Sequence, residues 1–103
     1  MAVTAITDDN FTDETSSGLV LVDFWAEWCG PCRMLGPIVE QLSNEMGSVQ
    51  FRKMNVDENP GVPSSLGISA IPTMVLYKDG KPIDKIVGLQ PKDQLKKVLE
   101  KHL

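Results

Sequence analysis

Hydrophobic positions along the chain switch between the spacing of strands and the spacing of helices. The clearest strand runs from Leu19 to Ala26, where apolar side chains outnumber polar ones and do not alternate with them. That pattern is typical of a central strand buried on both faces. Shorter strands are predicted at Val3 to Ile6, Val49 to Val56, Met74 to Tyr77 and Ile83 to Val87. The last two are joined at Asp79-Gly80, which is a strong hairpin signal.

Helical spacing marks two longer segments and one brief one. From Arg33 to Met46 the apolar residues fall at helical spacing, and Gly47 ends the segment. The predicted apolar positions are Met34, Leu35, Ile38, Val39, Leu42 and Met46. Pro37 lies inside this segment and is expected to kink it. A last helix is predicted from Pro91, with one apolar stripe formed by Leu95, Val98, Leu99 and Leu103.

The remaining segments are expected to be short helices or loops. Thr7 is expected to cap a brief helix that runs toward Thr15. Asp57 to Gly67 is expected to be loop with one helical turn at most. The order strand, helix, strand, helix, strand, hairpin and helix predicts an α/β fold with a mixed sheet and helices on both faces. With 103 residues, the chain is expected to form one domain, 1–103.

Composition narrows the function classes. Hydrophobic residues make up 42% and charged residues 23%, which is the balance of an ordinary globular protein. A net charge of −4 makes nucleic acid and anionic lipid poor partners. No apolar run approaches the length of a membrane span, and the segment from Met1 to Thr4 lacks the features of a secretory signal. We therefore expect a cytoplasmic, reducing setting; a mature exported chain, which would have the same sequence features, is the alternative.

The two cysteines, Cys29 and Cys32, have the spacing C-x-x-C between the central strand and a helix. As a structural disulfide they would close a loop of only four residues, worth about 2 kcal/mol. A zinc site needs more ligands, and the only histidine, His102, is the penultimate residue. Inert buried thiols are the other alternative. The start of a helix stabilises a thiolate, so this placement favours redox chemistry.

The segment 23–32 (DFWAEWCGPC) resembles the active-site segment of the thioredoxin family. Further matches follow in order along the chain at 55–60, 71–73, 78–80 and Gly88. The resemblance implies the thioredoxin fold, with a central mixed five-stranded sheet flanked by four helices. It also implies a protein disulfide reductase in which Cys29, the more exposed thiol, attacks and Cys32 resolves the mixed disulfide. Gly30-Pro31 between the cysteines is the dipeptide of the reducing members.

Asp23 is a lone carboxylate in an apolar strand, so we expect its pKa to be raised. The alternative is a tolerated aspartate at a strand end or edge. The resemblance implies proton exchange between Asp23 and Cys32 through water, alongside Lys53. Lys53 alone is weaker support, because a lysine on a strand commonly extends to solvent.

Pro72 resembles the family's cis-proline, although an ordinary trans turn is the alternative from sequence alone. A cis bond would leave the Ile71 backbone free to pair with an extended substrate segment. The resemblance further implies an apolar docking surface formed by Trp28, Gly30, Pro31, Ile71 and Gly88. Trp25 is equally compatible with the core.

The resemblance implies no bound cofactor and no metal, because electrons come from NADPH through a flavoprotein thioredoxin reductase. The expected partners are that reductase and disulfide-containing client proteins, and the protein is expected to be a monomer. An oxidant or isomerase, and a binding module without turnover, are the rival functions. Three positions depart from the family pattern: Gly36 in the long helix, and Pro63 and Leu66 in a short one.

Overall fold

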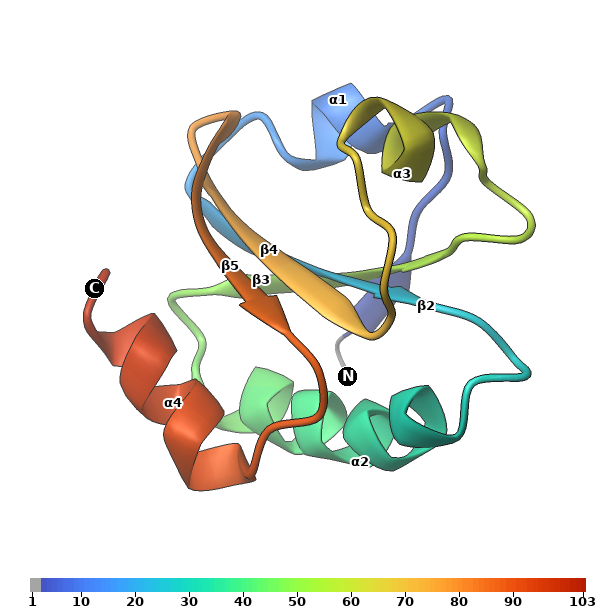
Figure 1. Cartoon of the computed structure of the whole chain (residues 1–103). Coiled ribbons are helices and arrows are strands. Elements are labelled where there is room, and N and C mark those ends of the chain that lie inside the picture. Colours follow the sequence, from blue (N-terminus) through green and yellow to red (C-terminus); the bar gives the residue numbers. More distant parts are fainter. Residues whose placement is uncertain (1–2) are drawn as a thin grey trace.

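The computed structural model describes residues 3–103 and contains one five-stranded mixed sheet with the strand order β1-β3-β2-β4-β5 (Figure 1). The first three strands in that order run parallel, β4 is antiparallel to β2, and β5 is antiparallel to β4. The strands are β1 (Val3–Ala5), β2 (Leu19–Trp25), β3 (Gln50–Asn55), β4 (Thr73–Lys78) and β5 (Lys81–Val87). The mixed sheet predicted from the sequence is confirmed.

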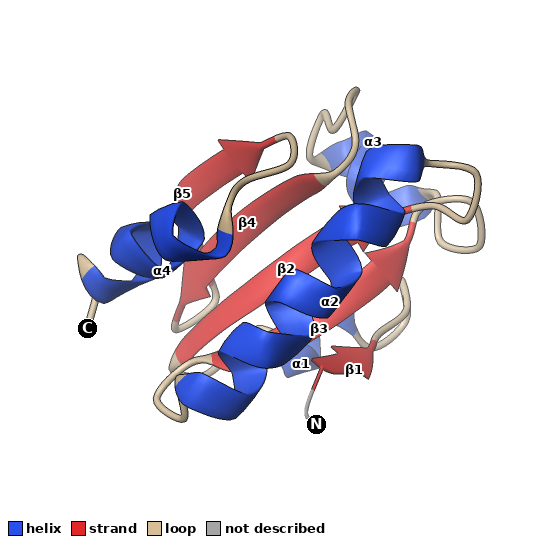
Figure 2. Cartoon of the chain, turned by 90° about the horizontal axis from the view of Figure 1, so that it is seen from below, coloured by secondary structure: helices blue, strands red, loops and turns tan. Residues whose placement is uncertain are grey.

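Four helices cover the two faces of the sheet. Figure 1 shows α1 (Phe11–Glu14) and α3 (Gly61–Ser65) on one face. The other face is covered by α2 (Gly30–Glu45) and α4 (Lys92–Glu100), which lie in front of the strands in Figure 2. This arrangement confirms the fold class implied by the family resemblance.

Strand β2 lies at the centre of the sheet and contributes to a core on each side. Val20, Val22 and Phe24 pack in the cluster under α1 and α3, whereas Leu21 packs in the cluster under α2 and α4. Successive side chains on a strand point to opposite faces, so Asp23 shares the α2 face with Leu21. The strand therefore carries its one carboxylate toward the helix that begins at the cysteines.

The first helix differs from the sequence prediction. Residues 8–10 form turns, and α1 begins only at Phe11, with Asn10 as its N-cap. Thr7 is therefore not the N-cap of this helix. The Asp8 carboxylate instead accepts hydrogen bonds from the backbone N–H groups of Gly61 and Val62, at 2.9 and 2.8 Å. Asp8 thus caps α3, a five-residue helix in the loop where one helical turn was predicted.

The long helices also differ in detail. Helix α2 begins at Gly30, ahead of the predicted Arg33, and continues through Pro37. Its buried stripe includes Leu35 and Val39, whereas the side chain of Met34 is 64% exposed because it lies off that stripe. Helix α4 ends at Glu100, so Leu103 lies beyond it and is 62% exposed. No helix within residues 3–103 has the length and apolarity to cross a membrane.

Candidate active site

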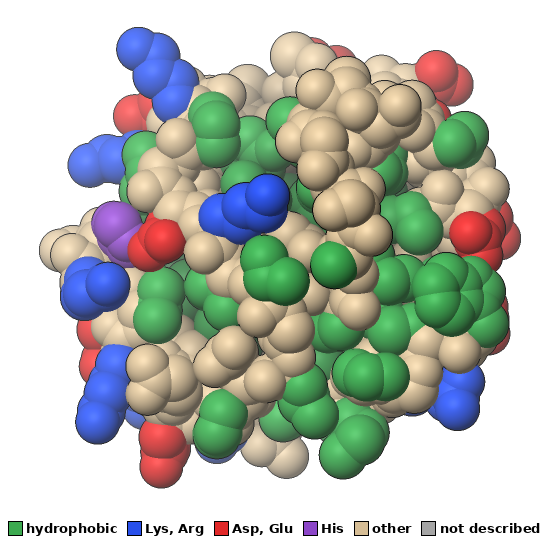
Figure 3. All heavy atoms as spheres, in the orientation of Figure 1, with side chains coloured by type: hydrophobic (Ala, Val, Ile, Leu, Met, Phe, Trp, Pro, Cys, Tyr) green, Lys and Arg blue, Asp and Glu red, His purple; other side chains and the backbone are tan. Residues whose placement is uncertain are grey.

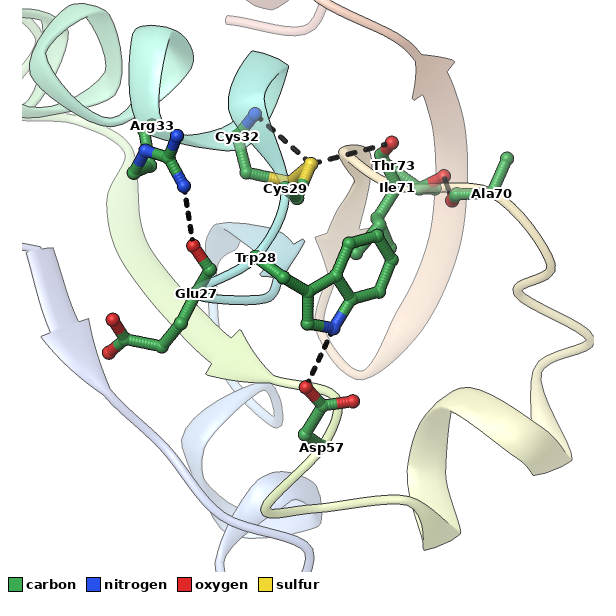
Figure 4. The surroundings of a disulfide bond; sticks show 9 residues. All are labelled: Glu27, Trp28, Cys29, Cys32, Arg33, Asp57, Ala70, Ile71 and Thr73. Atoms are coloured by element: carbon green, nitrogen blue, oxygen red, sulfur yellow. Dashed lines mark hydrogen bonds between the residues drawn. A yellow bond between two sulfur atoms is a disulfide. The ribbon is translucent and has the colours of Figure 1, made fainter.

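The two cysteines lie where β2 leads into α2 and are joined in a disulfide (Figure 4). Cys29 is the N-cap of α2 and Cys32 lies in its first turn, with Pro31 at the helix start. Their Cα atoms are 5.2 Å apart, within the range that a disulfide needs. Because the pair spans the first turn, it can open and close without unwinding the helix.

The helix start distinguishes the two sulfurs chemically. Cys29 Sγ accepts a hydrogen bond from the backbone N–H of Cys32 at 3.2 Å. That N–H belongs to the first turn of α2, where the positive end of the helix dipole also favours negative charge. Of the hydrogen bonds described at the pair, this one gives the Cys29 sulfur a backbone N–H donor at the helix start.

Exposure does not distinguish the sulfurs. In the disulfide form Cys29 is 4% exposed and Cys32 is 3% exposed, so both are buried, and the larger exposure expected for the Cys29 thiol stays a prediction for the reduced form. Both cysteines lie in a small cluster with Ala26, and Trp25 and Ile71 pack against that cluster. The disulfide is therefore covered by apolar neighbours.

The loop before β4 meets the cysteines from the other side. The Ile71–Pro72 peptide bond is cis, as the sequence resemblance implied, and the trans alternative is excluded. The Ile71 carbonyl oxygen lies 3.8 Å from Cys29 Sγ (Figure 4). Gly88 donates its backbone N–H to the Pro72 carbonyl oxygen at 2.8 Å, which brings the end of β5 to the same place. Three segments distant in sequence thus border the disulfide.

Trp28 stands out from this surface, with 68% of its side chain exposed. Its indole Nε1 donates a hydrogen bond to Asp57 Oδ2 at 2.8 Å, and this bond orients the ring beside the disulfide (Figure 4). Sequence reasoning missed Asp57, because the contact joins positions 29 residues apart.

Other apolar side chains are exposed on the segments that lead to and from the site. Val87 is 53% exposed and Leu89 is 38% exposed, and these two residues flank Gly88 in the sequence. Met34 borders a hollow of about 340 Å³ together with Leu89. Apolar side chains gather on this side of the molecule in Figure 3. The sequence reasoning did not include these exposed apolar residues.

Asp23 is buried in the middle of β2, with only 4% of its surface exposed. It pairs with Lys53 on β3 and with Met74 on β4, which excludes a position at a strand end or sheet edge. Burial raises the pKa of Asp23 to about 7, and the positive charge of Lys53 lowers it in part. The raised pKa expected from the sequence is confirmed.

Asp23 and Cys32 border the same small hollow. Its volume is about 150 Å³, and it is lined by Asp23, Trp25, Cys32, Arg33, Gly36 and Lys53. A second hollow, of about 290 Å³, shares Asp23, Gly36 and Lys53 and extends to Glu40. A hollow of this size and polarity accommodates water between the carboxyl group and the sulfur.

Metal binding has no support in the part of the chain that the structure describes. No group of three or more histidine, cysteine, aspartate or glutamate side chains within residues 3–103 is placed to hold a metal ion.

Known proteins match this chain over its length. A family model described as thioredoxin matches residues 2–101. The thioredoxin of Staphylococcus saprophyticus is 49% identical over 104 residues, covering 100% of both chains. Thioredoxins of Staphylococcus haemolyticus and Staphylococcus aureus (strain N315) are 48% and 47% identical with the same coverage. With a matching sheet, a matching C-x-x-C pair at disulfide distance and relatives of this similarity, the chain belongs to the thioredoxin family and is a thiol–disulfide oxidoreductase.

Proposed function

We propose that this protein reduces disulfides in client proteins, with Cys29 as the attacking thiolate and Cys32 as the resolving thiol. The observation that carries the proposal is the hydrogen bond from the Cys32 N–H to Cys29 Sγ at the start of α2. A thiolate is the reactive form of cysteine, and the helix start stabilises it on one sulfur of the pair.

The proposed reaction has two displacement steps. The Cys29 thiolate attacks one sulfur of the client disulfide, which forms a mixed disulfide and releases the first client thiolate. Cys32 then gives its proton to Asp23 through water and attacks Cys29 Sγ. This second step forms the Cys29–Cys32 disulfide and releases the second client thiolate. Two electrons pass to the client, whose thiolates take up two protons.

Asp23 suits this role because its pKa of about 7 lets it accept and return a proton near neutral pH. Lys53 is the second group proposed here, since it lies opposite Asp23 in the β2–β3 register. The shared hollow supports transfer between Cys32 and Asp23 without direct contact.

Clients are proposed to dock on Trp28, Gly30, Pro31, Ile71, Pro72 and Gly88. An extended client segment would pair with the Ile71 backbone, as an added strand. The exposed Trp28 ring and the neighbouring apolar side chains supply area for that contact.

The partner that restores the dithiol is proposed to be a flavoprotein thioredoxin reductase that uses NADPH. The chain itself is proposed to act without a bound cofactor, as a cytoplasmic monomer formed by one domain. Sedimentation of the purified protein over a range of concentrations tests the monomer, and a single species that doubles in mass would contradict it.

The order of attack is tested by trapping. We expect Cys32→Ser to accumulate covalent complexes with client proteins through Cys29, because the mixed disulfide then lacks its resolving thiol. Cys29→Ser is the matched control and should trap almost none. Faster labelling of Cys32 than of Cys29 by iodoacetamide in the reduced protein, near neutral pH, would contradict the assignment.

The direction of the reaction separates a reductase from the two rival functions. Equilibration with glutathione buffers should show a potential more negative than the glutathione couple. A more positive potential would favour an oxidant or isomerase. The double variant Cys29→Ser, Cys32→Ser should lose all reduction of insulin, whereas a binding module would retain its cellular role without either cysteine.

A further inference from the structure

Lys53 lies close to Asp23 in the sheet, yet its ammonium group is placed over another side chain. Lys53 Nζ lies 5.9 Å from the centroid of the Trp25 ring. Among residues 3–103, the ion pairs within 4.0 Å do not include Lys53 with Asp23. Asp23 Oδ1 is buried without a hydrogen-bond partner. The register places the two residues opposite each other, so the missing contact needs a physical reason.

Trp25 offers the ammonium group another partner. It follows Asp23 by two positions on β2, so both side chains lie on the α2 face of the sheet and line the same hollow. The face of an indole ring carries negative electrostatic potential and attracts a cation within about 6 Å of its centroid. Lys53 is half-buried beside both residues, and its flexible side chain can reach either one.

We propose that Trp25 is a positioning residue: its indole ring holds the Lys53 ammonium group and so prevents a direct ion pair between Lys53 and Asp23. This inference deepens the proposed function and rests on it, because it concerns the carboxyl group that exchanges a proton with Cys32.

The position of Lys53 matters because a direct ion pair would favour the charged form of Asp23. An adjacent cation lowers the pKa of a carboxyl group, and an Asp23 of lower pKa would be a weaker base toward the Cys32 thiol. With Lys53 held over Trp25, burial dominates and the pKa of Asp23 remains near 7. Trp25 thus keeps the carboxyl group able to change its charge near neutral pH.

Other charged and titratable groups also border Asp23. Helix α2 contributes Cys32, Arg33 and Glu40 to the hollows that Asp23 lines. The Arg33 guanidinium donates a hydrogen bond to the Glu27 carbonyl oxygen at 2.8 Å, which orients it toward the turn before the helix (Figure 4). On the β4 side, Asp23 pairs with Met74, which does not titrate. The test below leaves all of these groups unchanged.

The test measures the pKa of Asp23 by NMR titration of its carboxyl carbon in the disulfide form. Trp25→Leu removes the ring, and we expect the pKa of Asp23 to fall by on the order of one pH unit as Lys53 moves to the carboxylate. Trp25→Phe keeps an aromatic face, so its shift should be smaller. The same pair of variants in a Lys53→Gln background is the control, where no shift should follow.

Two outcomes would overturn the proposal. In the first, the pKa of Asp23 stays constant or rises in Trp25→Leu. In the second, Trp25→Leu lowers this pKa by the same amount in the Lys53→Gln background as in the protein with Lys53. The second outcome would mean that water entering the space of the indole ring acts on Asp23 directly.

A measurement on the unsubstituted protein keeps the test independent of variant folding. The ring current of Trp25 should shift the ε-methylene protons of Lys53 upfield from their position in an unstructured peptide. Unshifted ε-methylene protons would place Lys53 elsewhere and overturn the proposal.

Failure of this inference and failure of the proposed function are distinguishable. If Asp23→Asn slows disulfide exchange while Trp25→Leu leaves the pKa of Asp23 unchanged, only the role of Trp25 is lost. If Trp25→Leu lowers that pKa while Asp23→Asn exchanges at full rate, Trp25 positions Lys53 but the proton role of Asp23 is lost.

Discussion

Asp23 is a residue whose proposed function lowers the stability of the fold at neutral pH. Its carboxyl group is buried in the central strand, and its pKa of about 7 exceeds the ordinary value of 3.8. The folded state therefore holds the proton more tightly than the unfolded state does. This preference stabilises the fold most below pH 3.8, and it is lost progressively as the pH rises to about 7.

From this linkage we predict that Asp23→Asn is more stable than the original protein at pH 8, by on the order of 3 kcal/mol, and that the difference shrinks toward pH 4. The amide is neutral at both pH values, so burying it carries no ionisation penalty. Disulfide reduction should slow by on the order of 10- to 100-fold, because Cys32 loses its proton acceptor. Urea unfolding between pH 4 and 8, paired with reduction rates, measures both effects.

The matched control for this prediction is Asp9→Asn, which removes an exposed carboxylate from a turn far along the chain. It should change neither the pH dependence of unfolding nor the reduction rate. A variant Asp23→Asn that is less stable at pH 8, or equally fast, would remove Asp23 from the proposed mechanism.

The sequence predicts single functional residues well where their chemistry is local. Cys29 and Cys32 follow from their spacing at a helix start, and Asp23 follows from its apolar surroundings in one strand. Contacts between distant segments have no local signal. The hydrogen bond from Trp28 to Asp57 and the placement of Lys53 over Trp25 depend on how β2 and β3 lie side by side.

At the scale of elements, α2 contains a glycine that its helix does not require. Gly36 lies in the interior of α2, and a Cβ atom added there would meet nothing within 4 Å. Glycine in a helix interior loses more backbone entropy on folding than alanine. The residue therefore weakens the helix that carries both cysteines without any steric need.

We predict that Gly36→Ala raises the free energy of unfolding by about 1 kcal/mol and the midpoint of thermal unfolding by roughly 4–8 °C. Gly67→Ala is the matched control, because its Cβ would also meet open space but its φ of 69° strains alanine. That control should be destabilised. If both variants change stability in the same direction, backbone conformation does not explain the effect of Gly36.

Element boundaries were less predictable than element types. Strand and helix assignments followed from apolar spacing, and the hairpin followed from Asp79-Gly80. The short helices did not, because α3 is capped by Asp8 from 53 residues away. Met34 was expected among the core positions of α2, although it lies off the stripe formed by Leu35 and Val39. A prediction centred on the stripe formed by Leu35 and Val39 would have placed Met34 outside the core.

For the whole molecule, the position of the disulfide follows from the strand order. β2 lies between β3 and β4, so its end is bordered by the start of β4 and, through Gly88, by the end of β5. Exposed apolar side chains gather on the side where these segments meet (Figure 3). The C-terminal end of the chain lies on the opposite side in Figure 1. An exposed apolar residue near the disulfide can therefore be compared, by mutation, with a similarly exposed one on the opposite side.

We predict that Trp28→Ala raises the KM for a protein disulfide by about tenfold, equivalent to about 1.4 kcal/mol, since a large exposed ring beside the disulfide is lost from the docking surface. The KM for a small aromatic disulfide should change much less, because a small substrate reaches Cys29 without covering that surface. Leu103→Ala is the matched control: Leu103 is 62% exposed, close to the 68% of Trp28, but lies at the far end of the molecule. Its KM for both substrates should stay constant. If Trp28→Ala instead raises the KM equally for the protein disulfide and for the small disulfide, Trp28 acts on the geometry of the cysteines rather than on client docking.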